Sequence, residues 1–226
     1  MEIGTGWGGF ALYAAKNYGC RITSTTISQE QFIFSENLIK KNGLQDQVTI
    51  LKKDFRELEG QFDKLVSIEM IEAIGHRLYK TFFQKWDNYL SQRVYSQYKQ
   101  LQLPIICFMS PKDFIDFISN TFFQAVDSFI SALCSAASSS DIKLFHLEDI
   151  TPHYARTSRN GEPTFCKIKA ALRTWVHESF YSTWLFYLCY CEGGFIERQI
   201  GMFKWFLPSH YVEEIQYYRT ETVGQN

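Results

Sequence analysis

The chain has 226 residues, with 23 Lys and Arg against 24 Asp and Glu, so its formal net charge is -1. Hydrophobic residues make up 46% of the chain and charged residues 21%, which is enough apolar material for a core and excludes a disordered chain. A near-neutral charge without a block of Lys and Arg leaves no electrostatic footprint for nucleic acid, so a nucleic-acid-binding protein is disfavoured.

The first ninety residues alternate between helix and strand patterns. The expected elements, in chain order, are a glycine-rich turn over 4–9, an apolar helix that stops at Gly19, a strand over 21–25, a helix over 28–41, strands over 48–51 and 62–68, and a helix over 78–90. A capping box opens the second helix, in which the Ser28 hydroxyl takes the amide of Gln31 and the Gln side chain reaches back. This order favours a doubly wound α/β sheet with right-handed crossovers.

The second half of the chain shows no continuous pattern. Periodicity dissolves over 91–107, 124–129 and 159–176, while the stretches between them look well formed. No internal repeat and no linker rich in Pro, Gly or Ser divides the chain. We therefore expect a single domain over residues 1–226, with a regular half over 1–90 and an irregular half over 91–226.

The cysteines and the apolar runs bear on the compartment. No C-x-x-C pair and no His at metal-ligand spacing is present, so neither a zinc site, nor another metal site, nor a disulfide framework is indicated. The six cysteines, interpreted as reduced thiols in the cytoplasm, are Cys20, Cys107, Cys134, Cys166, Cys189 and Cys191. No run approaches the roughly 18 apolar residues of a membrane span, so membrane contact is expected only at the surface. Nothing in the sequence favours one oligomeric state over another.

The sharpest feature is the end of the first expected strand, which reads Glu2-Ile3-Gly4-Thr5-Gly6-Trp7-Gly8-Gly9. Glycines there let the backbone pass close to a ligand, and the following helix presents free amides. A G-x-G pattern alone is also compatible with a dinucleotide site. The acid two residues before the first glycine, and the lack of a glycine at the third fingerprint position, argue against a nicotinamide cofactor.

The E-I-G-x-G-W-G-G form resembles motif I of the S-adenosylmethionine-dependent methyltransferases, and specifically that of the cyclopropane-fatty-acyl-phospholipid synthase family. Four later blocks also resemble this family in the same order, and they are 25–31, 62–76, 146–157 and 186–195. Many methyltransferases carry an acid for the ribose at the end of the second strand. This chain has none there, and the family likewise uses its Thr and Gln. Five blocks in order make the resemblance specific.

The resemblance implies a Rossmann-like class I methyltransferase fold with a mostly parallel, doubly wound sheet. It implies transfer of the sulfonium methyl of S-adenosylmethionine to the cis double bond of an unsaturated phospholipid acyl chain, which then closes to a cyclopropane ring. An alkene is a poor nucleophile, so the enzyme must hold it against the methyl and keep water from the carbocation. In the family a bound bicarbonate then takes a proton, held by a Glu and a Tyr that match Glu72 and Tyr154.

The cofactor-binding residues that the resemblance implies are Glu2, Gly4, Thr5, Gly6, Trp7, Gly8, Gly9, Thr25, Thr26, Gln31, Asp54 and Phe55. Glu69 is near Glu72 but is not the matched position, so it is assigned no role. His76 and His153 are interpreted as structural. Without the resemblance, Glu72 would be interpreted as a solvated carboxylate and Tyr154 as an ordinary half-buried side chain.

Two departures from the family are expected to matter. The chain starts inside the first strand, so it lacks an upstream segment that carries helices over the active site and an anion-site Cys. When permitted codons for 91–104 and 160–169 are read from the third base, they give peptides that resemble the family's next strand and a later helix. The matches from shifts at 124–129 and 202–206 are weaker. We interpret these patches as short frame errors or gene decay, and real divergence is the alternative. The sheet is then expected to be incomplete, without the strand after residue 90 and without the last strand, and the half over 91–226 is a degraded acyl-substrate half.

Two alternatives remain beside cyclopropane formation. The first keeps the methyl donor and changes the acceptor to another lipid or a small molecule. The second is a non-catalytic remnant of the family, which binds S-adenosylmethionine without turnover.

Overall fold

The computed structural model describes residues 1–90, 101–108, 130–142, 144–167 and 177–207. Its centre is a seven-stranded sheet in the order β3-β2-β1-β4-β5-β7-β6. The strands are β1 (Glu2–Ile3), β2 (Ile22–Thr26), β3 (Val48–Lys52), β4 (Leu65–Val66), β5 (Leu101–Phe108), β6 (His146–Asp149) and β7 (Ile200–Phe206). The strands from β1 to β5 pair in parallel, and β7 runs antiparallel to both of its neighbours. The expected doubly wound α/β sheet is therefore confirmed.

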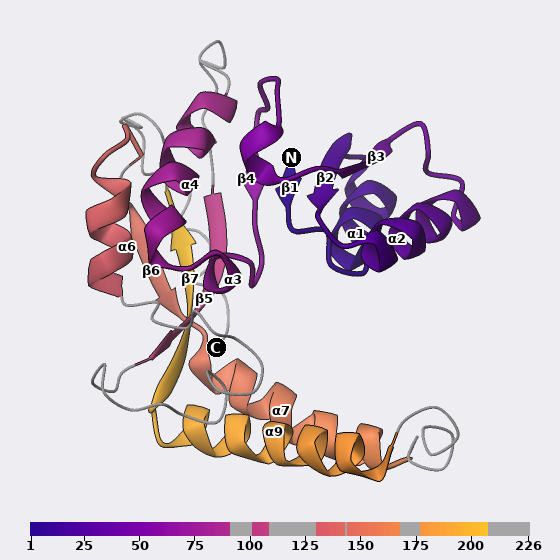
Figure 1. The fold of residues 1–226 in the computed structure, drawn as a ribbon, viewed down its shortest axis with the longest axis vertical. Coiled ribbons are helices and arrows are strands. Elements are labelled where there is room, and N and C mark those ends of the chain that lie inside the picture. Colours follow the sequence, from indigo (N-terminus) through magenta and orange to yellow (C-terminus); the bar gives the residue numbers. More distant parts are fainter. Residues whose placement is uncertain (91–100, 109–129, 143, 168–176, 208–226) are drawn as a thin grey trace, which may run out of the picture.

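The helices cover the sheet in three groups. They are α1 (Gly9–Tyr18), α2 (Gln29–Lys41), the short 3-10 helix η1 (Phe55–Glu57), α3 (Ile71–Ile74), α4 (His76–Tyr89), α6 (Ile130–Ala137), α7 (Thr151–Lys167) and α9 (Glu178–Ile196). Figure 1 shows α1 and α2 beside the first three strands, α4 and α6 beside the other half of the sheet, and α7 with α9 as a pair that extends away from it. Within the described ranges, no helix is long and apolar enough to cross a membrane.

Local signals in the first half form as expected. Gly19 follows α1 in the left-handed conformation and its amide bonds to the Ala15 carbonyl. The Ser28 hydroxyl accepts the Gln31 amide at 3.2 Å, which confirms the N-cap of α2. The Gln31 side chain differs from the expected capping box, because its Oε1 accepts the Thr26 hydroxyl at 2.7 Å instead of reaching back to Ser28. Thr26 thereby joins the end of β2 to the start of α2.

The expectation of an incomplete sheet is wrong. The strand β5 pairs with β4 on one side and, from Gln102 opposite Phe206 to Phe108 opposite Ile200, with β7 on the other. All but one residue of β7 are buried, and a buried strand reads as a continuous apolar run whose sequence need not match the family. The helix α7 likewise continues through 159–167 with Pro163 inside it. The patches 91–100, 124–129, 168–176 and 208–226 lie outside the described residues.

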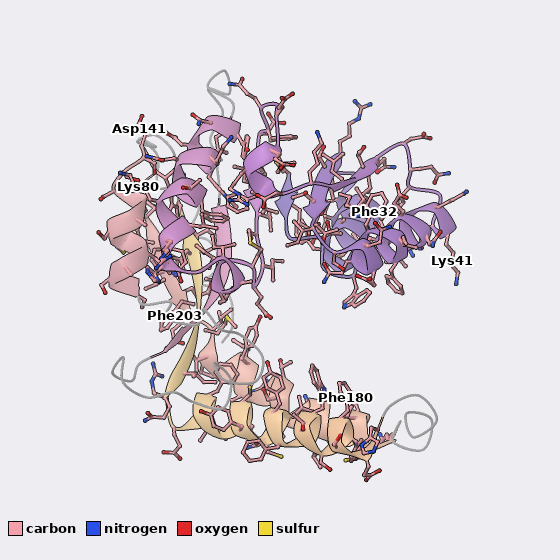
Figure 2. All side chains as sticks on the ribbon, in the orientation of Figure 1. Phe32, Lys41, Lys80, Asp141, Phe180 and Phe203 are labelled. Atoms are coloured by element: carbon pink, nitrogen blue, oxygen red, sulfur yellow. The ribbon has the colours of Figure 1, made fainter. Side chains whose placement is uncertain are left out.

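Three groups of buried side chains form the core. The largest joins α4 and α6 to the sheet, and its fully buried members include Phe82, Phe83, Trp86 and Trp205. The second lies between α1, α2 and the strands β2 and β3, and the third lies where α7 and α9 meet β7. In Figure 2, Phe32 lies with α2 at one end of the sheet and Phe203 lies on β7. Many aromatic residues of this chain therefore serve the core.

Candidate functional site

The glycine-rich turn follows β1 and leads directly into α1. Gly4, Gly6 and Gly8 have φ angles of 96°, 52° and 79°, in the left-handed region that favours glycine. A Cβ on Gly4 would lie 3.1 Å from the Met70 side chain and one on Gly8 3.1 Å from the Ser35 hydroxyl, whereas one on Gly6 would meet nothing within 4 Å. The turn is thus packed at both ends and open at Gly6, beside the free amides of the first turn of α1.

A buried chain of hydrogen bonds supports this turn from below. The Ser24 hydroxyl donates to a carboxylate oxygen of Glu2 at 2.5 Å, so the Thr5 hydroxyl must donate to Ser24, at 2.6 Å. All three side chains are buried. Burial raises the pKa of Glu2 to about 7, although the Ser24 bond opposes the shift. The predicted acid Glu2 therefore anchors the turn and does not face solvent.

The remaining predicted residues of β2 and the turn lie around the same edge. Trp7 is 58% exposed and stands edge-on to Phe34 of α2, with ring centroids 5.3 Å apart. The Thr25 carbonyl accepts the amides of Gly4 and Thr5 at 3.0 and 2.9 Å. Its hydroxyl donates to the Lys53 carbonyl at 2.5 Å, which ties β2 to the segment after β3. The side chain available to a ligand here is Trp7, while Thr25 holds the backbone in place.

Asp54 and Phe55 follow β3 at the same end of the sheet. The Asp54 carboxylate caps η1 by accepting the Arg56 amide at 2.8 Å, and it also forms a salt bridge with the Arg56 guanidinium at 2.8 Å. These bonds to Arg56 hold the pKa of Asp54 below its ordinary value. Phe55 is buried in the core, where its carbonyl accepts the Tyr89 hydroxyl. Asp54 is therefore paired with Arg56, and Phe55 is held in the core by Tyr89.

A second group of polar residues lies at the end of β4. Glu72 is buried at the start of α3, and Tyr154 lies in the first turn of α7. The Tyr154 hydroxyl donates to Glu69 at 2.5 Å. Burial raises the pKa of Tyr154, and the hydrogen bond to Glu69 and the charges of Glu69 and Glu72 add to the increase. The structure therefore brings Glu72 and Tyr154 together with Glu69.

The two groups of residues share one edge of the sheet. Because β1 and β4 are parallel neighbours, their carboxyl ends lie side by side where the strand order reverses, the usual ligand position in doubly wound folds. The Ser67 hydroxyl donates to the Ile3 carbonyl at 2.8 Å. Met70, between Glu69 and Glu72 in sequence, packs on Gly4. The acidic loop after β4 is therefore fixed against the glycine-rich turn.

Glu69 is the residue of this site that the sequence did not identify. Its partner Tyr154 is 85 positions away, and no local pattern shows such a contact. Glu69 also has a φ of 50°, which is uncommon for any residue with a Cβ. The available signal was a second acid three residues before the matched one, at the end of a buried strand.

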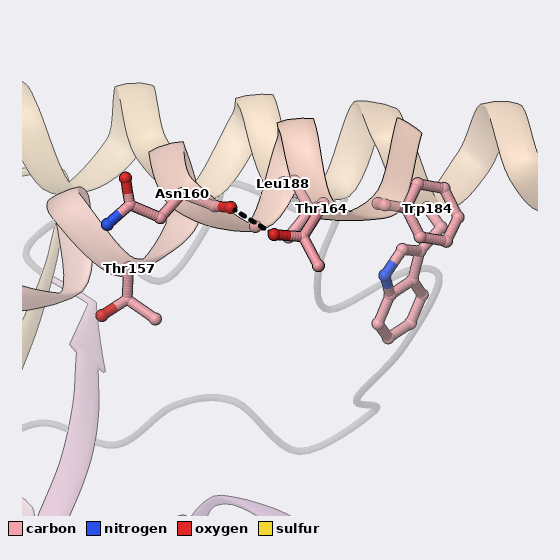
Figure 3. A pocket seen from close by; sticks show the side chains of 7 residues that line it. Thr157, Asn160, Thr164, Trp184 and Leu188 are labelled. Carbon is pink, nitrogen blue, oxygen red and sulfur yellow. Dashed lines mark hydrogen bonds between the residues drawn. The ribbon is translucent and has the colours of Figure 1, made fainter. Parts of the chain in front are cut away.

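A separate groove lies between α7 and α9. It has a volume of about 460 Å³ and is lined by Thr157, Asn160, Gly161, Thr164, Phe165, Trp184 and Leu188. Figure 3 shows the polar residues Thr157, Asn160 and Thr164 along α7, with Trp184 on the facing helix. None of the predicted site residues lines this groove. In the described part of the chain, no group of three His, Cys, Asp or Glu residues could hold a metal ion.

A doubly wound sheet with an antiparallel seventh strand, and an acid followed by a glycine-rich turn after β1, make up the class I methyltransferase fold. A family model described as mycolic acid cyclopropane synthetase matches residues 1–205, and the chain belongs to this family. Several relatives are named as methyltransferases, and one of them, UmaA of Mycobacterium tuberculosis, is named as S-adenosylmethionine-dependent.

Individual relatives agree with this membership. Tuberculostearic acid methyltransferase UfaA1 of Mycobacterium tuberculosis is 27% identical over 92% of this chain and 49% of its own length. Cyclopropane-fatty-acyl-phospholipid synthase of Escherichia coli is 42% identical over 40% of this chain and 22% of its own length. The structure of the cyclopropane synthase MmaA2 from Mycobacterium tuberculosis has a TM-score of 0.82 at 20% identity, over 91% of this chain and 76% of that one. The chain therefore spans about half the length of UfaA1, and its match to the Escherichia coli synthase spans less than a quarter of that protein.

Proposed function

We propose that this chain transfers the methyl group of S-adenosylmethionine to the cis double bond of an unsaturated phospholipid acyl chain and closes a cyclopropane ring. The observation that carries the proposal is the group of Glu69, Glu72 and Tyr154 beside the glycine-rich turn. Methyl transfer to an ordinary nucleophile, which can lose its proton to water, does not need these carboxylates and this phenol. Ring closure requires removal of a proton from the transferred methyl, which needs a base at the cofactor's methyl group.

The glycine-rich turn fits S-adenosylmethionine. The open space at Gly6, the exposed Trp7 and the amides of α1 offer a backbone surface and an aromatic face to the cofactor. When bound, the cofactor supplies an electrophilic methyl on a sulfonium. The residues of the chain then have three tasks: the turn holds the donor, apolar residues keep water from the cation, and the acidic loop receives the proton. Glu72 and Tyr154 belong to the third task.

The described residues do not favour bicarbonate at this place. The single proton of the Tyr154 hydroxyl is donated to Glu69, so Tyr154 cannot donate to a second anion at the same time. The charges of Glu69 and Glu72 both act on this hydroxyl, so an added anion would meet like charge. A bound bicarbonate stays a prediction for this chain.

The acceptor in this proposal is a lipid in a membrane leaflet, reached from the membrane surface. Phe180 and Phe186 on α9 are 48% and 53% exposed and lie on the helix pair that extends away from the sheet. A name among the relatives supports a second acceptor class, because UfaA1 is named for tuberculostearic acid. The assay must therefore separate a ring from a methyl branch.

The direct test incubates the chain with S-adenosylmethionine carrying a trideuterated methyl and with vesicles of dioleoyl phosphatidylglycerol. We expect acyl chains that gain a methylene bridge and retain two of the three deuterons, because ring closure removes one. A methyl branch formed with loss of a proton from an acyl-chain carbon would retain all three deuterons and a double bond, and would replace the proposed product by the alternative. Cofactor binding by calorimetry without any lipid product would support the non-catalytic remnant.

Replacing the buried carboxylate tests the role of the acidic loop. We expect Glu72→Gln to lower the rate of methyl transfer by about 10²–10³-fold, because it removes a buried negative charge that stabilises the developing cation. Binding of S-adenosylmethionine should change by less than about twofold, because Glu72 is separate from the turn. The matched control is Glu148→Gln, which removes only an exposed pair with Lys204. Unchanged turnover in Glu72→Gln would remove this residue from the site.

A further inference from the structure

Glu69 occupies an unusual position in the loop between β4 and α3. Its φ of 50° lies in the left-handed region, which residues with a Cβ rarely adopt. Such a conformation persists when surrounding contacts determine it, and these positions cluster at functional sites. Here the loop is held on both sides, by the Ser67 bond to β1 and by Met70 against Gly4. The backbone therefore aims the Glu69 side chain in one direction.

That direction leads to Tyr154. The phenol donates to Oε1 of Glu69 at 2.5 Å, a charge-assisted bond of the short kind. A phenol has one proton, so this bond uses the whole donor capacity of Tyr154. Any other anion would have to displace Glu69 to reach this donor. Glu69 therefore stands where an exogenous anion held by Tyr154 would stand.

The two carboxylates of the site differ in their access to a ligand. Glu72 is only 4% exposed, whereas Glu69 is an exposed residue. The charge of Glu69 also acts on Tyr187 of α9, whose pKa is raised chiefly by burial, with Cys191 and then Glu69 contributing. Glu69 thus remains accessible while it is bonded to Tyr154 of α7, whereas Glu72 is buried. An exposed, oriented carboxylate can reach a substrate directly.

We propose that Glu69 is the base of the reaction and takes the place of a bound anion at Tyr154. This inference rests on the proposed function. The methyl carbon leaves sulfur and bonds to one alkene carbon, which leaves a cation at the other. A carboxylate oxygen of Glu69 takes one proton from the methyl carbon, and the released C–H electron pair forms the bond that closes the ring. Tyr154 positions the carboxylate through its hydrogen bond.

One experiment tests the geometry without turnover. The chain is labelled with ¹³C at the tyrosine Cζ, Tyr154→Phe assigns the resonance, and sodium bicarbonate is added against sodium chloride at equal ionic strength. We expect the Tyr154 resonance of the unchanged chain to stay in place, because Glu69 holds its proton. Glu69→Gly removes the carboxylate and relieves the left-handed φ. In this variant the Tyr154 resonance should shift as bicarbonate is added, and the shift should reach a plateau. An equal, saturable shift in the unchanged chain would overturn the proposal.

A second experiment tests the chemistry in buffer depleted of bicarbonate under argon. We expect full methyl transfer by the unchanged chain, a loss of about 10²-fold or more in kcat for Glu69→Gln, and partial rescue of Glu69→Gly by added bicarbonate. The control is Glu148→Gln, and thermal unfolding confirms that each variant is folded. Activity of the unchanged chain that requires bicarbonate, or normal kcat in Glu69→Gln, would overturn the role of Glu69. Absence of any transfer by the unchanged chain would instead refute the proposed function, and the resonance experiment would still decide what holds Tyr154.

Discussion

Glu2 is a carboxylic acid kept in the core of the protein at the point where β1 ends. Its side chain has one described hydrogen-bond donor, Ser24, which is itself supported by Thr5. One hydroxyl does not offset the loss of water around a carboxylate, so the protonated form is favoured in the folded chain. The residue that precedes the glycine-rich turn in the sequence therefore also makes this turn sensitive to pH.

The stability of the protein should fall as Glu2 ionises. The pKa of Glu2 is about 7 in the folded chain against an ordinary value of 4.5. Between these values the folded state binds more protons than the unfolded state, so the free energy of unfolding decreases with rising pH and levels off above 7. The loss is on the order of 3 kcal/mol. Urea unfolding between pH 4.5 and 8 should show this decline in the unchanged chain, and Glu2→Gln should lack most of it; equal slopes would contradict the assignment.

Some residues of this site could be predicted from the sequence and one could not. The predicted Glu2, Gly4 and Gly8 lie where expected because the turn is a local structure that glycines specify. Glu72 and Tyr154 were inferred from matched blocks, and the structure places them in one group. Glu69 was not found, because a bond between residues 69 and 154 depends on how α7 is docked. Local patterns carry no information about that docking.

Among the elements, α2 is the one whose start is most clearly encoded. Ser28 caps its first turn, and Thr26 joins it to β2 through Gln31. Lys40 and Lys41 in the last turn complement the helix dipole. The sequence therefore predicts both ends of this helix within a residue or two.

Removing the cap should destabilise α2 by a defined amount. We expect Ser28→Ala to lower the free energy of unfolding by about 1 kcal/mol, because the Gln31 amide loses its acceptor. Ser28→Asn is the matched control, since Asn caps helices about as well as Ser. Thermal and urea unfolding of the two variants measures the difference. A loss of the same size in both would show that the Ser28 hydroxyl does not cap α2.

Elements of the second half were harder to predict for a physical reason. The strand β5 lies mostly in the patch over 91–107, where no strand was expected, yet it pairs with β4 and β7 at a defined register. A strand at the centre of a sheet is selected by its neighbours more than by its own alternation. The helix α7 similarly extends through Pro163. Near its end, the ring of Phe165 stacks on that of Tyr181 of α9, with ring centroids 4.8 Å apart. Tertiary packing overrides weak local preference in both cases.

At the scale of the whole molecule, the sheet unites the parts that the sequence separates. The strands β1 to β4 come from the regular first half, and β5, β6 and β7 come from the half that was expected to be degraded. The largest core group contains Leu65 and Trp86 from the first half and Leu133, Phe203 and Trp205 from the second. A core shared in this way predicts that both halves unfold together.

Trp205 offers the sharpest test of this shared core. It is fully buried on β7, opposite Leu103 of β5 and Leu147 of β6. Trp205→Ala should lower the free energy of unfolding by about 3–5 kcal/mol, because it leaves a large cavity in the largest core group. The control Phe180→Ala, at a 48% exposed position on α9, should stay within about 0.5 kcal/mol of the unchanged chain.

The same variants reveal whether the chain folds as one unit. Urea unfolding followed by far-ultraviolet circular dichroism reports all elements, whereas tryptophan fluorescence is weighted toward the buried Trp86 and Trp205. We expect the two signals to coincide in a single transition, because the seven described strands form one sheet. We also expect Trp205→Ala to shift the midpoints of both signals together. Separate transitions, or a Trp205→Ala chain as stable as Phe180→Ala, would mean that β7 is not held in the sheet as the structure places it. The docking of α7 onto β7 would then also fail, and with it the contact that brings Tyr154 to Glu69.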